Sequence, residues 1–311
     1  MISDLFSLNV LIGILTSGVR LATSYLYAAI GETFGQISGV LNLGVEGIML
    51  VSAYAAYYVV LQTGDLGLGL LAAIVVGLAM GLMMAFISVT LKAEQGISGI
   101  GVYLFGLGLS DLLFRITVKA PTTVTGFPDI TIPVLTDLPI LGPVLFKQNI
   151  LVYGAFALVP LAWFILNKTT FGLKIRAVGQ HPEAADTLGI NVARVRYITV
   201  TLGGALSGIA GASLSIALLN IFQQNLTSGQ GFIAVALVYF GAWKPARVML
   251  GCLLFSMVNA LQLWIQVLNV PIPPDLALMM PYVLTIVALM FAARQAYGQQ
   301  AALTKPFERG E

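Results

Sequence analysis

The chain has 311 residues, of which 58% are hydrophobic and only 9% are charged, and its formal net charge is +2. Soluble domains carry about 25% charged residues, so a chain with so few charges has too little polar surface to dissolve in water. The composition therefore predicts an all-α integral membrane protein, and the small net charge gives no indication of nucleic-acid binding.

The apolar runs predict a polytopic bundle of about eight or nine transmembrane helices, within one domain over residues 1–311. A helix rises about 1.5 Å per residue, so about 20 apolar residues cross a hydrocarbon core of about 30 Å. The run 231–243 is too short to span easily, which predicts a broken half-helix there. The runs that we assign as helices cover residues 8–30, 45–62, 66–91, 96–115, 149–167, 197–220, 231–243, 247–268 and 277–293.

The first unusual stretch follows the first helix, at residues 38–47. Glycines interrupt it three times, and Asn42 and Glu46 are polar residues within an apolar run. Backbone that leaves the helical pattern at membrane depth is tolerated only where protein or a water-filled path surrounds it. One interpretation is a broken helix that lines a solute path. The other is a turn in which Glu46 caps the following helix. The residues alone favour neither.

Two pairs of glycines lie four residues apart inside predicted helices. Gly77 and Gly81 form one pair, and Gly204 and Gly208 form the other. Small residues at this spacing let helix backbones approach closely. We expect these glycines to pack helices within this subunit.

Basic residues orient the chain, because cytoplasmic loops carry an excess of lysine and arginine. The segment 168–196 has five basic residues against two acidic ones, and two further basic clusters fall on the same side if the spans alternate. We therefore expect residues 168–196 in the cytoplasm. The segment 116–147 has five prolines and balanced charges, which predicts an ordered external loop.

The second unusual stretch, in this cytoplasmic segment, predicts a two-turn helix over residues 182–188. Pro182 suits the first helical position, Glu183 and Asp186 lie in the early turns, and Gly189 can end the helix. A helix this short is marginal alone in water. It either needs a partner surface or is an ordinary helix packed within the loop.

Residue types needed for common catalytic centres are scarce. The chain has one histidine, His181, and one cysteine, Cys252, which cannot build a zinc site, a proton relay or a catalytic triad. No glycine-rich stretch ends in the Lys-Ser or Lys-Thr of a phosphate loop. We therefore expect no catalytic residue, metal or cofactor in this chain, and any energy for transport must come from elsewhere.

An ion-coupled carrier usually places ionisable groups within the membrane. The candidates here are Arg20, Glu46, Asp111 and Arg115. Asp111 and Arg115 are spaced by four residues on one helix, which favours a local ion pair.

A third stretch, residues 229–245, predicts a glycine-flanked half-helix that begins outside and ends at a Trp-Lys-Pro turn inside. The three stretches, in this order, resemble the permease subunits of ABC importers of the ribose and branched-chain amino acid type. The first stretch reads Gly-Val-Leu-Asn-Leu-Gly-Val-Glu-Gly at residues 39–47, which is most similar to the nucleoside-importer subgroup. The resemblance covers residues 10–295. Residues 94–113 depart from it, because they lack the Asn-rich sequence of many relatives.

The resemblance implies a fold like that of type II ABC importers, and an assembly of several chains. Two permeases, of which the second is a paralogue, would enclose a path for nucleosides across the bacterial inner membrane. ATPase subunits would hold ATP and Mg, and an extracytoplasmic solute-binding lipoprotein would deliver the solute. Membrane lipids would surround the helices. The alternatives are a permease for a sugar or a branched-chain amino acid, or a stand-alone secondary carrier.

The short helix at 182–188 matches the coupling helix of these permeases, which docks in a groove on the ATPase. A stand-alone carrier has no use for such an element. The basic residues Lys174, Arg176, Arg194 and Arg196 that flank it either assist docking or hold the loop at lipid headgroups. The residues to which the resemblance assigns coupling are Gly179, His181, Pro182, Glu183, Ala184, Ala185, Asp186, Leu188 and Gly189.

Polar and aromatic residues near the predicted helix ends are candidates for the solute path. Amide groups match the donors and acceptors of a base and a ribose, and aromatic rings can stack on a base. The alternative role for each residue is helix capping or hydrogen bonding between helices. The candidates are Asn42, Glu46, Gln95, Asn220, Phe222, Gln223, Gln224, Gln230, Gln262 and Trp264.

Overall fold

The computed structural model describes residues 8–308 except 134, 137, 269–272 and 294–299. Within these residues, seven helices are long and apolar enough to cross a membrane, which confirms the predicted all-helical polytopic bundle. They are α2 (Leu8–Ile37), α3 (Val45–Thr63), α4 (Leu66–Ala85) continued by the π-helix η1 (Phe86–Thr90), α5 (Gln95–Thr117), α7 (Ile150–Lys168), α10 (Val192–Ser213) continued by the π-helix η2 (Leu214–Leu218), and α12 (Pro245–Val267).

Two further apolar helices complete the bundle. Helix α11 (Gln230–Phe240) has 11 residues, about 16 Å of helix, which confirms the predicted half-helix. Helix α13 (Pro274–Ala293) packs against α12. Most boundaries agree with the predicted runs to within a few residues, since the length of an apolar run is a local property of the sequence.

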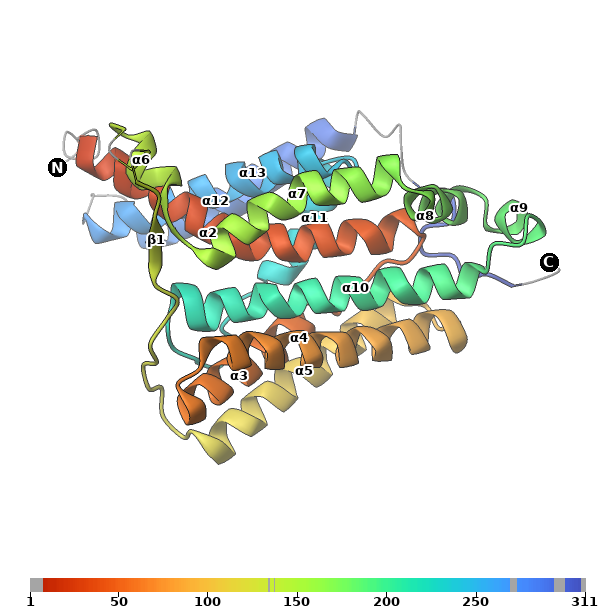
Figure 1. Ribbon diagram of the computed structural model, residues 1–311, viewed down its shortest axis with the longest axis horizontal. Coiled ribbons are helices and arrows are strands. Elements are labelled where there is room, and N and C mark those ends of the chain that lie inside the picture. Colours follow the sequence, from red (N-terminus) through yellow and green to blue (C-terminus); the bar gives the residue numbers. More distant parts are fainter. Residues whose placement is uncertain (1–7, 134, 137, 269–272, 294–299, 309–311) are drawn as a thin grey trace.

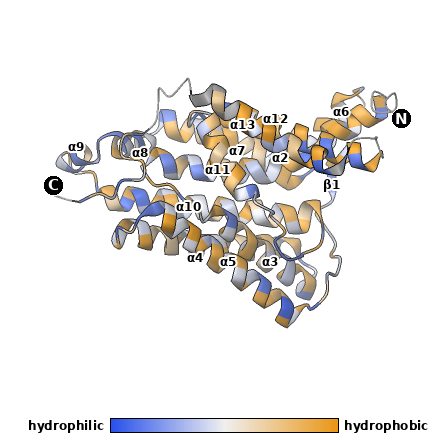
Figure 2. Ribbon diagram, turned by 180° about the vertical axis from the view of Figure 1, so that it is seen from behind, coloured by the Kyte–Doolittle hydropathy of each residue, from blue (hydrophilic) through white to orange (hydrophobic). Residues whose placement is uncertain are grey.

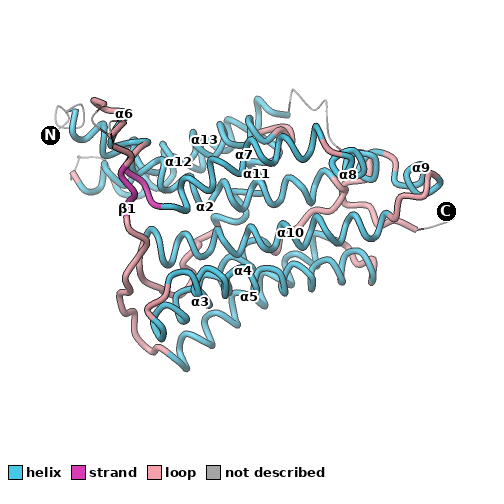
Figure 3. The backbone as a smooth tube through the Cα atoms, viewed as in Figure 1, coloured by secondary structure: helices cyan, strands magenta, loops and turns pink. Residues whose placement is uncertain are grey.

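The long helices lie side by side along the long axis of the molecule (Figure 1). Strands β1 (Asp129–Thr131) and β2 (Lys147–Asn149) and the short helix α6 (Leu141–Leu145) gather at one end, which we call the β1 end. Helices α8 (Thr170–Gln180) and α9 (Pro182–Thr187) gather at the other, which we call the α9 end. The smooth tube of Figure 3 shows that loops are concentrated at these two ends. The middle of the bundle is coloured mainly as hydrophobic in Figure 2.

Helix α2 is the central element, and it packs against α7, α10, α11 and α12. Every residue from Leu21 to Ile37 is buried. The helix continues for seven residues beyond the predicted end at residue 30. Gly31 in this added part lets α10 pack closely, because a Cβ atom there would lie 3.0 Å from the carbonyl oxygen of Gly203 on α10. The polar residues of the added turns have partners inside the protein, so they do not end the helix.

The predicted packing of the glycine pairs is confirmed, and the two pairs pack against each other. Helix α4 presents Gly77 and Gly81 to Gly204 and Gly208 of α10. A Cβ atom on Gly77 would lie 2.4 Å from the carbonyl oxygen of Gly204, and one on Gly204 would lie 2.6 Å from the Cα atom of Gly81. Side chains larger than hydrogen would separate these two backbones.

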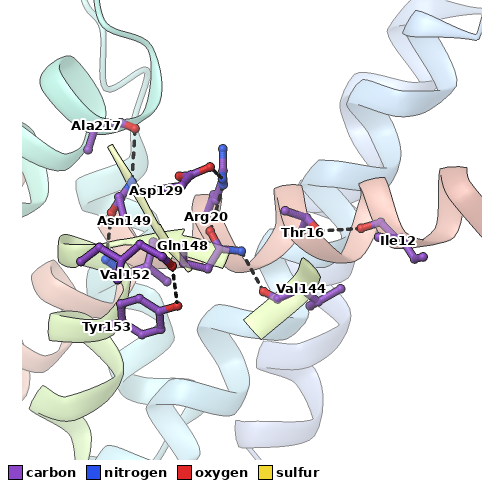
Figure 4. A network of polar contacts seen from close by, with 11 residues as sticks. Ile12, Thr16, Arg20, Asp129, Val144, Gln148, Asn149, Val152, Tyr153 and Ala217 are labelled. Carbon is purple, nitrogen blue, oxygen red and sulfur yellow. Dashed lines mark hydrogen bonds and ion pairs between the residues drawn. The ribbon is translucent and has the colours of Figure 1, made fainter. Parts of the chain in front are cut away.

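The segment between α5 and α7 is held on the bundle at the β1 end by an arginine of α2 (Figure 4). Strands β1 and β2 pair antiparallel, with Asp129 opposite Asn149. Arg20 Nη2 lies 2.6 Å from Asp129 Oδ2, and its Nε donates to Gln148 Oε1 at 2.9 Å. The side chain of Arg20 therefore holds this loop through an ion pair and a hydrogen bond.

The predicted ion pair between Asp111 and Arg115 on α5 is confirmed at 3.0 Å.

Capping side chains define where several helices begin. Asp65 accepts hydrogen bonds from the backbone of α4, Asn149 from α7, Thr169 from α8 and Asn191 from α10. At the start of α5, the backbone N–H groups of residues 96 and 97 donate to the carboxylate of Glu94 and hold its pKa below its usual range.

Candidate functional site

The backbone between α2 and α3, residues 38–44, leaves the helical conformation inside the protein. Gly39 has a φ of +93°, which favours glycine. Side chains from other helices satisfy the unwound backbone. Gln95 of α5 accepts from the N–H of Leu41 at 2.8 Å, and Arg196 of α10 donates to the carbonyl of Ser38 at 3.2 Å. The first unusual stretch is therefore a non-helical connection between two complete spans, α2 and α3, and protein encloses it. We call this segment the break.

A buried carboxylate that sequence reasoning missed also stabilises this break. The side chain of Glu32 on α2 accepts from the backbone N–H of Asn42 at 2.9 Å and from Gln36 Nε2 at 3.1 Å. Gln36 Oε1 in turn accepts from Trp243 Nε1 at 2.8 Å, which links the break to the turn after α11. An acid followed four residues later by an amide was the available signal. It was missed because the predicted helix ended at residue 30.

Glu46 joins the first turn of α3 to the start of α11. Its Oε1 accepts from the hydroxyl of Thr227 and from the backbone N–H of Gly229, and its Oε2 accepts from the backbone N–H of Gly231. The side chain is almost fully buried. Glu46 therefore caps a helix, although that helix begins far along the chain and does not directly follow Glu46.

This contact neutralises the positive end of the half-helix. Free N–H groups at a helix start attract anions, and half-helix starts at membrane depth commonly face the solute. Here the chain supplies the anion itself. Gly231 allows the close approach, because a Cβ atom there would lie 2.6 Å from the Cα atom of Glu46.

The predicted path residues on the segment between η2 and α11 have different surroundings. Phe222 is fully buried, with ring centroids 5.6 Å from Tyr54, 6.0 Å from Tyr57 and 5.3 Å from Phe114. The carbonyl of Asn220 accepts from the N–H of Val124 at 2.9 Å. Gln223 and Gln224 are exposed. In this conformation, Phe222 is a core residue whose ring is covered by other aromatic rings.

Three further candidates lie on α11 and α12, and two of them contact α2. Gln230 accepts from Ser24 Oγ at 2.9 Å. Trp264 Nε1 donates to Ser17 Oγ at 3.3 Å, and its ring packs on Gly13. Gln262 is buried on α12. The structure thus places Asn42 and Gln95 at the break, Gln230 beside the middle of α2 and Trp264 beside its start, so the candidates are spread along the bundle. Their contact with solute stays a prediction.

The predicted coupling segment forms a helix over Pro182–Thr187, and Gly189 follows it with a φ of +80°. Ala185 is buried against the bundle, whereas Glu183, Ala184 and Leu188 are exposed. Leu188 has 81% of its surface exposed. The helix therefore presents an apolar side chain outward at the α9 end.

Of the other predicted coupling residues, His181 is exposed and directly precedes α9, and Asp186 is part of α9. The loop that carries α9 is held to the C-terminal segment at two points, one before the helix and one after it. On the bundle side, the carbonyl of Gly179 accepts from the N–H of Ala302 at 3.0 Å. Arg196 also donates to the carbonyl of Lys305 at 3.1 Å. Residues 300–308 thus tie the loop to α10.

Comparison with known proteins gives the family. The family described as the permease component of the branched-chain amino acid transport system matches residues 14–289. The chain belongs to this family. The match confirms the resemblance seen in the three unusual stretches, and it makes this permease a multi-pass membrane protein with a transport role.

Three relatives of this permease cover most of its length. A putative glucose ABC transporter permease of Haloferax volcanii is 41% identical, over 85% of this chain and 80% of the relative. A guanosine ABC transporter permease of Bacillus subtilis is 38% identical, over 86% of this chain and 88% of the relative. A nucleoside ABC transporter permease of Lactococcus lactis is 32% identical, over 90% of this chain and 92% of the relative. No solved structure matches the chain significantly.

Proposed function

We propose that this permease is the membrane-spanning subunit of an ABC importer that carries nucleosides into the cell. The observation that carries the proposal is the similarity to permeases named for guanosine and for nucleosides over most of both chains. The motif at residues 39–47 supports the same subgroup. The relative named for glucose gives a second candidate, a sugar. Both solutes are uncharged and present the hydroxyl groups of a sugar ring.

The contact between Glu46 and α11 supports an uncharged solute. The donors at the start of the half-helix are occupied by the carboxylate of Glu46, so they do not attract a second anion. A nucleotide would meet Glu46 as a like charge. This favours nucleosides and sugars over nucleotides.

The proposed importer needs other chains. ATP hydrolysis, with its Mg, takes place on an ATPase that contacts α9, and an extracytoplasmic binding protein delivers the solute. Bacillus subtilis and Lactococcus lactis each have a second, more distant relative with the same kind of name. This supports a pair of two different permeases in the inner membrane. The α9 end then faces the cytoplasm.

The proposal is tested by deleting the gene in its host and measuring uptake of labelled guanosine and labelled glucose. We expect guanosine uptake to fall, and to return when the gene is supplied on a plasmid. An excess of unlabelled adenosine or uridine should compete with guanosine, whereas guanosine monophosphate should not. Loss of glucose uptake with unchanged guanosine uptake would establish the sugar importer instead.

A further inference from the structure

A cavity of about 580 Å³ opens at the α9 end between α7, α8 and the turn from α11 to α12. Three of its lining residues are basic: Arg176 comes from α8, and Lys244 and Arg247 come from the start of α12. Its lining among the described residues contains no aspartate or glutamate. The ion pairs of the described chain involve other residues, so these three cations have no acidic partner there.

The backbone around Lys244 is fixed by contacts with α2. Ala242 and Trp243 both have positive φ angles, of 48° and 56°, in the turn that ends α11. The indole N–H of Trp243 donates to Gln36, and this hydrogen bond holds the turn in place. The basic residues are therefore grouped by a defined turn, and their charges add within one cavity.

One wall of the cavity is apolar, and the helices that form the cavity also carry exposed apolar side chains. Trp163 and Leu166 of α7 line it, and the amine of Lys168 lies 5.9 Å from the centre of the Trp163 ring. Phe164 on α7 and Leu250 on α12 are exposed. Tryptophan and lysine beside a helix end are typical of the boundary between hydrocarbon and headgroups.

We propose that this cavity binds the headgroup of an anionic phospholipid. The cations contact the phosphate, and the acyl chains lie along the exposed apolar side chains of α7 and α12. Basic pockets between transmembrane helices are suited to anionic headgroups. A lipid bound here contacts both α8, which leads into α9, and the turn that ends α11, so it braces the loop against the half-helix.

The test uses the full-length permease in vesicles of phosphatidylcholine with increasing amounts of phosphatidylglycerol whose acyl chains are brominated. Bromine quenches tryptophan fluorescence on contact, and two of the three tryptophans, Trp163 and Trp243, line the cavity. We expect brominated phosphatidylglycerol to quench at low mole fraction, and equally brominated phosphatidylcholine to quench only when it dominates the bilayer.

The variant Arg176→Gln/Arg247→Gln should require roughly tenfold more phosphatidylglycerol for the same quenching. The matched control Lys174→Gln/Arg194→Gln removes the same charge from exposed residues that do not line the cavity, and it should behave like the parent. Both variants replace exposed side chains, and equal unfolding temperatures will show that they fold. Equal quenching by the two lipids, or equal effects of the two variants, would overturn the proposal. So would displacement of quenching by inorganic phosphate at fixed ionic strength, which would indicate a site for the free anion.

Discussion

At the scale of single residues, the carboxylate of Glu46 holds together two segments that are far apart in sequence. A buried carboxylate is costly in a membrane protein unless its charge is compensated by hydrogen bonds. Two backbone N–H groups and one hydroxyl supply this compensation. The same bonds satisfy groups at the start of α11 that otherwise have no partner within the helix. The carboxylate of Glu46 therefore needs these donors, and the donors at the start of α11 need the carboxylate.

Replacing Glu46 with alanine should lower the stability of the purified permease by about 3 kcal/mol or more, because three donors, two of them buried, lose their acceptor. Glutamine should have a smaller effect, since its amide oxygen keeps part of the acceptor function. The thermal unfolding temperature in detergent measures the stability of both variants. Glu94→Ala is the control, because that carboxylate also caps a helix but is exposed to solvent. If Glu46→Ala and Glu94→Ala unfold at the same temperature, the donors of α11 have found other partners and the capping role is wrong.

At the scale of elements, α9 has the features of a docking helix. Its buried side fixes it to the loop, while Ala184 and Leu188 are directed away from the bundle. Leu188→Ala should weaken binding of the ATPase roughly tenfold or more, since burial of a leucine at an interface contributes about 1.5–3 kcal/mol. Ala184→Trp should have the same effect by preventing close approach. Co-purification of the ATPase and guanosine uptake are the two measurements.

Leu173→Ala is a matched control, because Leu173 is also an exposed leucine at the α9 end but lies on α8. This variant should keep both the ATPase and uptake. An ATPase that stays bound to Leu188→Ala and Ala184→Trp, with uptake unchanged, would show that α9 is not the coupling element.

The elements also show which parts of the fold could be predicted from the sequence. The spans and the half-helix were predictable because apolar length is local, and α9 was predictable from its proline start and glycine end. The last turns of α2 were not, because Glu32 and Gln36 are tolerated there only through partners at Asn42 and Trp243. The partner of Glu46 was likewise beyond reach, since it lies 181 residues away. Local patterns predict elements, but they do not predict which polar groups pair between them.

At the scale of the whole molecule, the segments 116–147 and 168–196 lie at opposite ends of the bundle (Figure 1). The excess of basic residues predicts that the second segment faces the cytoplasm. Thr123 and Thr187 are both exposed, and the single native cysteine is buried. In intact cells, a membrane-impermeant maleimide should label Thr123→Cys and not Thr187→Cys. Permeabilised cells, in which both should react, are the control. Labelling of Thr187→Cys alone would reverse the orientation.

The distance in sequence between Glu46 and α11 also affects how the protein is made. A ribosome adds about 5–20 residues per second, so the 181 residues between Glu46 and Thr227 take roughly ten to forty seconds to synthesise. During that interval, the carboxylate of Glu46 lacks the donors that later neutralise it. Burial of this side chain in its final surroundings therefore depends on residues 227–231, which are synthesised much later.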